Sequence, residues 1–205
     1  MRIEHFVLGE LKTNCYMLIE GNACLIIDPA DSADFLLEKI QRENLELVGM
    51  VGTHGHFDHI LAVGEIQLSY DVPFYCAIED EFLIKRVIAT AKHFLGHDPA
   101  IIQPQKITPF PEKSTDIIID TFQFQLLRVP GHTPGSVAFY FPDEHAVFTG
   151  DTLFKGAIGR TDLSYSDKRM LRSSIHSLFL LPEETTIYAG HGKETTIGEE
   201  KQLLL

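Results

Sequence analysis

Thr53-His54-Gly55-His56-Phe57-Asp58-His59 is the stretch that decides how this 205-residue sequence is interpreted. It places four side chains of the kinds that bind metal ions within six positions, after an apolar run and before a predicted helix that begins near Asp58. Alternation in an extended turn can direct His54 and His56 toward one ion. Asp58 and His59 are adjacent and can face a second. Burying four such groups without partners would cost a large free energy, so the stretch predicts a metal site rather than locally satisfied polar residues.

Three later positions repeat the same arrangement, in which an apolar run ends, a glycine follows and a ligand-type side chain comes next. They are His132, Asp151 and His191. Strand ends that each present a ligand can converge at one edge of a sheet, where α/β folds usually place their sites. The glycines let the backbone turn sharply and approach closely. Together the chain offers five histidines and two aspartates, and two ions about 3.5–4 Å apart need roughly seven protein ligands plus a bridging water, with one carboxylate shared.

The other histidines lack this context, and we expect surface or local structural roles for them: His5, His93, His97, His145 and His176. His97 stays open as a functional candidate because it lies beside Gly96 and Asp98 in a possible lid. The three cysteines form no C-x-x-C pair. Two of them, Cys15 and Cys24, lie in apolar strand-like runs, where we expect buried thiols that act as small hydrophobic side chains.

Strand-like runs rich in Val, Ile, Phe and Tyr alternate with helical patterns along the chain. The predicted strands cover residues 2–8, 14–20, 23–28, 46–52, 117–120, 122–129, 136–141, 145–149 and 185–189. Two β-rich halves with helices packed outside form a mixed α/β layered sandwich. The segment 96–116 contains four prolines and no clear periodicity, and is either a lid or binding loop or a plain connector between the halves.

Three helices have clear apolar stripes, at residues 32–43, 78–95 and 167–180. The first follows Asp31 or Ser32 as its cap, and the third follows Ser166. The predicted buried stripe of the third helix is Met170, Leu171, Ile175, Leu178 and Phe179. These stripes are interpreted as core rather than as a cofactor site.

The formal net charge of −12 disfavours binding to nucleic acid, which depends on neutralising phosphates with Lys and Arg. An anionic membrane surface is disfavoured for the same reason. No apolar run approaches the roughly 20 residues that span a bilayer. The first six residues alternate and include an acid, as in a strand rather than a secretory signal. We therefore expect a cytoplasmic protein with neither nucleic acid nor membrane as a partner.

At these motifs the sequence resembles the metallo-β-lactamase superfamily, specifically the short, single-domain bacterial members of its glyoxalase II-like (hydroxyacylglutathione hydrolase-like) branch. The motifs that carry the resemblance are Thr53–His59, Pro130–Ser136, Thr149–Phe154, Gly159–Asp162, Ala189–Gly192 and Glu194–Gly198. The resemblance implies an αββα sandwich of two mixed β-sheets with helices on the outer faces. It also implies one domain over residues 1–205, with pseudo-halves at about 1–105 and 106–205.

The resemblance further implies a ligand set for two divalent ions, most readily zinc, with iron or manganese also compatible. Metal one would take His54, His56 and His132; metal two would take Asp58, His59 and His191; Asp151 would bridge them. The implied activity is hydrolysis of a small-molecule thioester, such as an S-acylglutathione, to a carboxylate and a thiol. A metal-bridging hydroxide would attack the carbonyl carbon, and Asp58 would also orient the attacking water.

Two departures from the glyoxalase II pattern concern the thiol carrier. Only 14 residues follow His191, so we expect the additional C-terminal helical region that helps that family hold glutathione to be absent. Arg160 matches a basic substrate-contacting position, but Thr161-Asp162 replaces the aromatic partner that follows it there. Arg160 is therefore either a substrate-binding residue or half of a structural bridge to Asp162 or Asp167.

The nearest enzymatic alternative is a mononuclear iron persulfide dioxygenase, which by resemblance would use only His54, His132 and Asp151. A β-lactamase is less expected, because the common branch has Cys where this chain has Asp151. An RNA-processing nuclease is disfavoured by the net charge. A non-catalytic metal-binding module is a third alternative from a different class, and the complete ligand set speaks against it.

Overall fold

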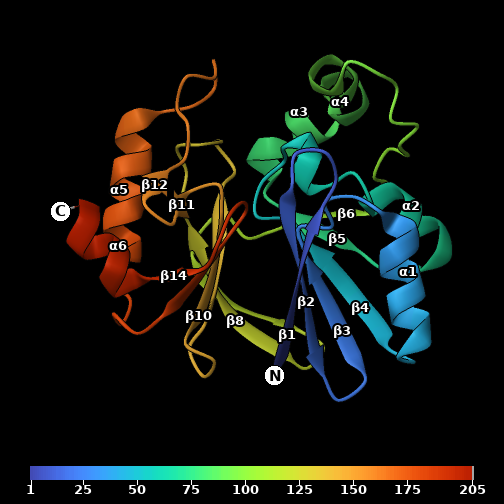
Figure 1. Cartoon of the computed structure of the whole chain (residues 1–205), viewed down its shortest axis with the longest axis horizontal. Coiled ribbons are helices and arrows are strands. Elements are labelled where there is room, and N and C mark those ends of the chain that lie inside the picture. The colour runs from blue at the N-terminus through green and yellow to red at the C-terminus, as the bar shows by residue number, and fades with distance from the viewer. Residues whose placement is uncertain (205) are drawn as a thin grey trace.

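Two six-stranded sheets face each other in the computed structural model, which describes residues 1–204 (Figure 1). The first sheet has the order β1-β2-β3-β4-β5-β6. Its strands are β1 (Arg2–Leu8), β2 (Thr13–Glu20), β3 (Ala23–Ile27), β4 (Glu46–Val51), β5 (Phe74–Cys76) and β6 (Ile107–Pro109). Strands β1 to β3 are antiparallel, whereas β3 to β6 run parallel.

The second sheet has the order β14-β13-β10-β9-β8-β7, and only its β10–β13 pair is parallel. Its strands are β7 (Thr115–Ile119), β8 (Phe122–Arg128), β9 (Val137–Phe141), β10 (Ala146–Gly150), β13 (Thr186–Ala189) and β14 (Thr195–Thr196). A small hairpin joins β11 (Leu153–Phe154) to β12 (Ala157–Ile158). The first sheet therefore uses residues up to 109, and the second begins at residue 115. The predicted single domain and its pseudo-halves stay a prediction, and residue 205 lies outside the described residues.

Four helices cover the outer faces of the two sheets, with α1 and α2 outside the first and α5 and α6 outside the second, while α3 and α4 lie at one edge of the sheets (Figure 1). The six helices are α1 (Ala33–Arg42), α2 (Val63–Ser69), α3 (Glu81–Ile84), α4 (Val87–Leu95), α5 (Lys168–Leu178) and α6 (Ile197–Leu204). Two short 3₁₀ turns are η1 (Phe57–His59) and η2 (Ile78–Asp80). The predicted αββα sandwich of two mixed sheets is confirmed.

Strand β3 shows how the sequence builds this layering, since it is buried on both of its faces. Leu25 and Ile27 pack into the layer between the sheets with the phenylalanines of β8 and β9. Cys24 and Ile26 point the other way, into the layer beneath α1. Successive side chains of a strand point to opposite faces, so a continuous apolar run is what a strand between two layers requires.

The three cysteines are buried, free thiols. Burial raises the pKa of Cys15 and of Cys24, which keeps both thiols protonated. Cys76 lies at the end of β5 and is equally buried. The prediction that Cys15 and Cys24 act as small hydrophobic side chains is confirmed.

The predicted helix over residues 78–95 is wrong as a single element, since the chain forms η2, α3 and α4 with a break at Lys85 and Arg86. The apolar spacing continues through the break, since α3 buries Leu83 and Ile84 and α4 buries Val87 and Ala91. The carboxylate of Asp80 accepts hydrogen bonds from backbone amides of two distant loops. These contacts fix the first turns in place, and hydrophobic periodicity does not detect them.

Helix α5 begins one residue later than predicted, and its cap is Asp167 rather than Ser166. The Asp167 carboxylate accepts from the amides of Arg169 and Met170. Met170 is 46% exposed, so its place in the buried stripe is also wrong. The rest of the predicted stripe is buried: Leu171, Ile175 and Leu178 share one side of the helix with Ser174, and Phe179 follows directly after it.

The helix predicted to begin near Asp58 is wrong in that position, where only the 3₁₀ turn η1 forms and α2 starts at Val63. Strands β5, β6, β11, β12 and β14 were not predicted; each has two or three residues, too few for a periodic pattern. Part of segment 96–116 forms β6, which pairs with β5. None of its residues lines the cleft at the metal centre, which favours the connector over the lid.

No helix within residues 1–204 combines the length and the apolar character that crossing a membrane requires. The cytoplasmic location stays a prediction.

Candidate metal centre

All seven predicted ligands come together at one edge of the two sheets. His54 and His56 follow β4, His132 follows β8, Asp151 follows β10 and His191 follows β13, while Asp58 and His59 lie in η1. Backbone bonds join the sheets here, from the Val137 amide to the Thr53 carbonyl (2.8 Å) and from the Asn14 amide to the Gly190 carbonyl (2.7 Å). We refer to His54, His56 and His132 as the metal-one group and to Asp58, His59 and His191 as the metal-two group.

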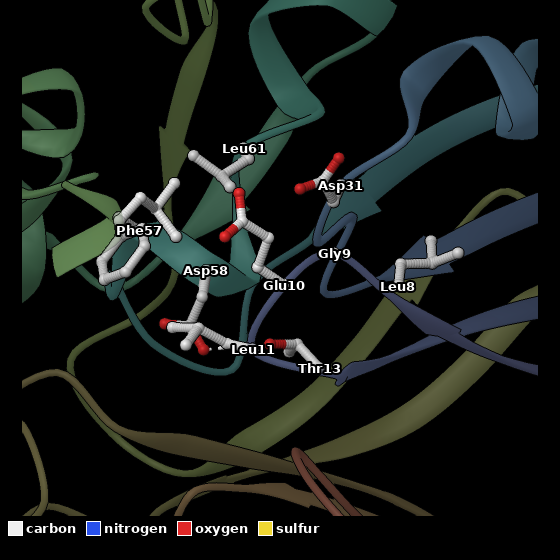
Figure 2. A pocket seen from close by; sticks show the side chains of 10 residues that line it. Leu8, Gly9, Glu10, Leu11, Thr13, Asp31, Phe57, Asp58 and Leu61 are labelled. Carbon is white, nitrogen blue, oxygen red and sulfur yellow. Dashed lines mark hydrogen bonds between the residues drawn. The ribbon is translucent and has the colours of Figure 1, made fainter. Parts of the chain in front are cut away.

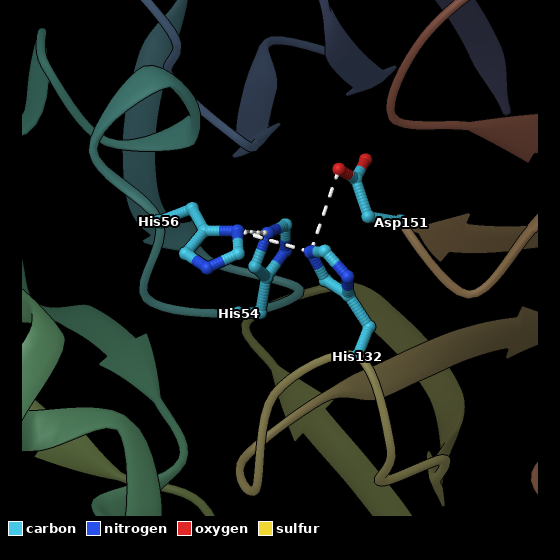
Figure 3. A group of neighbouring side chains, drawn as sticks. All are labelled: His54, His56, His132 and Asp151. Carbon is cyan, nitrogen blue, oxygen red and sulfur yellow. Dashed lines mark hydrogen bonds and ion pairs between the residues drawn. The ribbon is translucent and has the colours of Figure 1, made fainter. Parts of the chain in front are cut away.

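The metal-one group brings three imidazole nitrogens into contact (Figure 3). Nδ1 of His56 is 3.0 Å from Nε2 of His54 and 3.0 Å from Nε2 of His132. Oδ2 of Asp151 lies 3.6 Å from Nε2 of His132. These four side chains each present a ligand atom within 4.8 Å of the others.

The metal-two group lies on the other side of Asp151. Oδ2 of Asp58 is 3.3 Å from Nε2 of His191 and 3.7 Å from Nε2 of His59. Oδ1 of Asp151 is 3.4 Å from Nε2 of His59 and 3.8 Å from Nε2 of His191. One oxygen of Asp151 therefore faces each group, an arrangement that suits a carboxylate shared between two cations.

Each ligand histidine has an inner ring nitrogen that faces the centre and an outer one that faces away from it. The hydrogen-bond partner of the outer nitrogen, here called the outer partner, determines whether the inner nitrogen carries a lone pair. Nδ1 of His132 faces the Arg160 carbonyl at 3.0 Å, and Nδ1 of His59 faces a carboxylate oxygen of Asp28 at 2.9 Å. A carbonyl or a carboxylate accepts only, so each Nδ1 must carry the hydrogen. In the neutral imidazoles, the Nε2 atoms of His132 and His59 consequently point their lone pairs inward.

The same argument, from the partner of Nδ1 to the lone pair on Nε2, applies to His54 and His191. The Thr53 hydroxyl donates to Asp28 Oδ2 (2.7 Å) and therefore accepts from Nδ1 of His54 at 3.0 Å. Nδ1 of His191 faces the Lys12 carbonyl at 3.4 Å, a weaker contact. Both histidines thus also present Nε2 lone pairs to the centre. Such outer partners are the usual means by which proteins orient metal-binding histidines.

Two buried polar atoms at the centre have no hydrogen-bond partner among the described residues. They are Nε2 of His59 and Oδ1 of Asp151, and they face each other. A buried polar atom without a partner is costly. Lone pairs from imidazoles and carboxylates that converge without donors fit divalent cations, so the residues present match the two-metal set that the sequence predicts.

Burial and neighbouring charges shift the pKa values of the site in a consistent way. Burial, together with the surrounding histidines, holds the pKa of His54 well below its usual value. Burial and His132 lower the pKa of His56 to about 3. Burial also acts to lower the pKa of His59, but Asp58, Asp151 and Asp28 outweigh it and raise that pKa. The metal-one imidazoles His54 and His56 are therefore neutral, as metal binding requires, whereas the carboxylates around the metal-two group attract positive charge.

Glycine is required directly before two of the ligands. Gly150 adopts φ +51°, and a Cβ there would collide with the Thr53 side chain. A Cβ on Gly190 would collide with the Asp151 carboxylate, and also with the His59 ring at 2.6 Å. These positions place the strand ends close enough for their ligands to meet.

Several supporting residues were missed in the sequence. Asp28 accepts from the Thr53 amide at 2.7 Å as well as from His59. Asp80 accepts from the amides of two ligand loops, at Gly55 (2.9 Å) and Gly135 (2.7 Å), and burial raises its pKa. Both carboxylates are almost fully buried. The only available signal was an acid placed directly after an apolar run, as at Asp28.

A cleft of about 340 Å³ opens onto the centre. Its lining residues are Leu11, His56, Phe57, Asp58, Thr90, Phe94, His132, Asp151, Arg160, Leu163, Tyr165 and His191. Arg160 lines this cleft, and its Nε and Nη2 each donate to the Asp162 carboxylate at 2.7 Å. The bridge to Asp162 is thus present, whereas Asp167 caps α5 instead. Whether Arg160 also binds substrate stays a prediction.

The histidines outside the set of seven ligands do not line the cleft. His97 forms an exposed contact of 2.6 Å with Glu10 at the tip of the β1–β2 hairpin. His5 stacks on Tyr16, and His176 contacts a carbonyl of its own helix.

The chain matches known proteins over nearly its whole length. A family model described as the Metallo-beta-lactamase superfamily matches residues 8–191, a range that includes all seven ligands. The hydroxyacylglutathione hydrolase GloC of Haemophilus influenzae is 36% identical, with 98% of this chain and 96% of that relative aligned.

Two solved structures are similar in both sequence and fold. TTHA1623 in a di-iron-bound form is 36% identical with a TM-score of 0.88, covering 98% of both chains. The BLEG-1 B3 metallo-beta-lactamase is 33% identical with a TM-score of 0.91, covering 100% of both chains. The chain therefore belongs to the metallo-beta-lactamase superfamily, and it carries that superfamily's His and Asp cluster for binding metal ions.

Proposed function

We propose that this protein is a thioester hydrolase that converts an S-acylglutathione or a related thiol ester to a carboxylate and a thiol. The observation that carries the proposal is the complete set of seven ligand side chains, with Asp151 placed between two groups of three. The similarity to a hydroxyacylglutathione hydrolase over nearly the whole chain supports the thioester as the substrate class.

The metal-one group and Asp151 would hold one divalent cation, and the metal-two group and Asp151 a second. Bound there, two cations lower the pKa of a shared water toward neutrality and polarise a carbonyl oxygen. We propose zinc as the native metal, with iron or manganese as alternatives because nitrogen and oxygen ligands accept all three. A protein 36% identical to this one has a solved structure in a di-iron-bound form, which supports iron as an alternative.

The residues of the cleft orient the reactants. Oδ2 of Asp58 accepts from the Thr13 hydroxyl at 2.9 Å, which fixes the carboxylate at the border of the cleft. From there Asp58 can accept a proton from the attacking water and hold it in line with the carbonyl carbon. Leu11, Phe94 and Leu163 give the cleft apolar walls that exclude bulk water around the acyl group.

Two other activities predict different observations. A persulfide dioxygenase would need only His54, His132 and Asp151 with one iron, so metal stoichiometry and oxygen uptake distinguish it from a two-metal hydrolase. Hydrolysis of a β-lactam is favoured by one observation, the similarity to the BLEG-1 B3 metallo-beta-lactamase. A non-catalytic metal-binding module would show no turnover of any substrate.

Metal analysis of the purified protein, combined with hydrolysis of S-lactoylglutathione, tests the proposal. We expect two metals per chain and turnover that a chelator abolishes and added metal restores. One iron per chain with persulfide-dependent oxygen uptake would replace the proposal with the dioxygenase. Turnover of a penicillin or cephalosporin without thioester hydrolysis would replace it with a lactamase, and two bound metals with no turnover of either would leave a binding module.

A further inference from the structure

Tyr165 contacts the metal centre from outside the ligand set. It lies in the loop of residues 159–167 that leads into α5 and lines the cleft. Its hydroxyl is 2.8 Å from Nε2 of His56, and its ring packs edge-on against Phe82 with centroids 5.3 Å apart. The ring is thus held by packing while the hydroxyl meets a ligand imidazole.

His56 differs from the other four ligand histidines in its outer partner. The outer nitrogens of His59, His132 and His191 face carboxylate or carbonyl oxygens, which only accept hydrogen bonds. That of His54 faces a hydroxyl whose own hydrogen is directed at Asp28. The Tyr165 hydroxyl has no second partner among the described residues, so it can either donate to Nε2 of His56 or accept from it. His56 is therefore the ligand histidine whose tautomer depends on how a hydroxyl turns.

The two orientations have opposite consequences at the centre. If Tyr165 donates, Nε2 carries the lone pair, and the hydrogen on Nδ1 points at the Nε2 atoms of His54 and His132, each 3.0 Å away. That hydrogen would block a cation. If Tyr165 accepts, Nε2 carries the hydrogen and Nδ1 turns its lone pair toward the same position as the lone pairs of His54 and His132.

We propose that Tyr165 is the positioning residue of the metal-one group, whose hydroxyl accepts the Nε2 hydrogen of His56 and so frees His56 Nδ1 to bind a cation. The same loop orients a second imidazole of this group, since the Arg160 carbonyl accepts from His132 and the Ser166 hydroxyl donates to the His132 carbonyl at 2.7 Å. The described contacts of the metal-two histidines involve other segments. The effect of Tyr165 is therefore confined to metal one, and the proposal does not depend on the substrate.

The test uses Tyr165→Phe, which removes the acceptor and keeps the ring against Phe82. Zinc affinity is measured by competition with a chelator in a His191→Ala background, so that the titration reports metal one. Loss of an outer partner typically weakens metal binding about 10–100-fold, and we expect a rise in Kd of that size. Tyr188→Phe is the matched control, because Tyr188 stacks on Phe148 away from the cleft and should leave the Kd unchanged.

A role of Tyr165 in packing alone predicts a Kd within about twofold of the parent, and that result overturns the proposal. Long-range ¹H–¹⁵N spectra of the histidine rings give an answer that needs no variant. In the metal-loaded protein, His56 should carry its hydrogen on Nε2. A hydrogen on Nδ1 in that state would contradict the proposal, even if Tyr165→Phe failed to fold.

Discussion

The metal-one and metal-two groups are built from the same kinds of residue, yet the protein holds them differently. In the metal-one group, His54 and His132 are nearly inaccessible, and each of the three imidazoles has an outer partner within 3.0 Å. Those partners come from the segment after β4 and from the 159–167 loop. The metal-one group is therefore part of the folded core of the molecule.

The metal-two group combines a fixed ligand with a loose one. His59 is completely buried and bonded to Asp28, whereas the His191 side chain is 31% exposed and its outer contact is 3.4 Å long. That contact is to Lys12, in the β1–β2 hairpin tip (residues 9–12). Figure 2 shows this tip beside Asp58, which accepts from Thr13. We therefore expect metal affinity to depend on the folded core at the metal-one group and also on a surface hairpin at the metal-two group.

The largest expected effect comes from removing the residue that both groups share. Asp151→Ala should lower the metal content at both positions and reduce hydrolysis by more than about 100-fold, because losing an outer partner alone costs 10–100-fold. Metal content by elemental analysis and kcat/KM for S-lactoylglutathione check this. Asp143→Ala, in the exposed turn between β9 and β10, is the control. Full metal content in Asp151→Ala would contradict the bridging role.

Removing one ligand from each group should affect the unfolding temperature of the protein differently. His191→Ala is expected to retain about one metal per chain and to unfold, when metal-free, at the same temperature as the parent. His54→Ala should lose metal one and also unfold at a lower temperature by several degrees, because it leaves the buried Thr53 hydroxyl without its imidazole partner. About 1 kcal/mol shifts the Tm of a chain of this size by roughly 2–4 °C. Equal effects of the two variants on Tm would remove the distinction between the groups.

The sequence was sufficient to predict which side chains come together, because five of the seven follow strands whose ends converge at a sheet edge and the other two lie beside His54 and His56 in the chain. The residues that orient those ligands left much weaker signals. Asp28 and Asp80 act through backbone amides and imidazoles that lie 25 or more positions away in the chain. Tyr165 reaches His56 across 109 positions. Such contacts exist only once the loops have been brought together.

The errors in secondary structure have the same physical origin. Periodicity predicted one helix over 78–95, but Asp80 is held by two ligand loops, and the first turn of that segment is the 3₁₀ turn η2 rather than part of an α-helix. Ser166 looked like a helix cap, yet its hydroxyl donates to the His132 carbonyl and Asp167 caps α5. In both places tertiary bonds to the metal centre override a local preference.

A smaller effect is expected at the border of the cleft, where Arg160 is paired with Asp162. Both side chains are more than half exposed, so solvent screens the pair and it contributes little to stability. Asp162→Ala frees the guanidinium and should raise kcat/KM for an anionic glutathione thioester by up to about fivefold. A neutral N-acetylcysteamine thioester should be unaffected. An equal rise for both substrates would show that the charge of Arg160 does not select the thiol carrier.

The smallest effect concerns the hairpin tip on which the metal-two group depends. His97 contacts Glu10 of that tip at 2.6 Å, and Lys92 is paired with the neighbouring Asp98. The hydrogen bond to Glu10 raises the pKa of His97, with Asp98 adding to the shift. A histidine whose pKa is higher in the folded state stabilises the protein below its ordinary pKa of about 6.5, and this stabilisation is lost as the pH rises through the folded value.

His97→Gln should therefore lower the Tm of the metal-free protein at pH 6 by less than about 2 °C and leave it unchanged at pH 8.5. Comparing variant with parent at each pH cancels the titration of the other histidines. Because the tip also carries the Lys12 carbonyl, the same variant should release metal two to a chelator slightly faster at pH 6, while metal one is retained as before. A faster release of metal one would mean that the two groups share the hairpin, and that the core does not hold metal one independently.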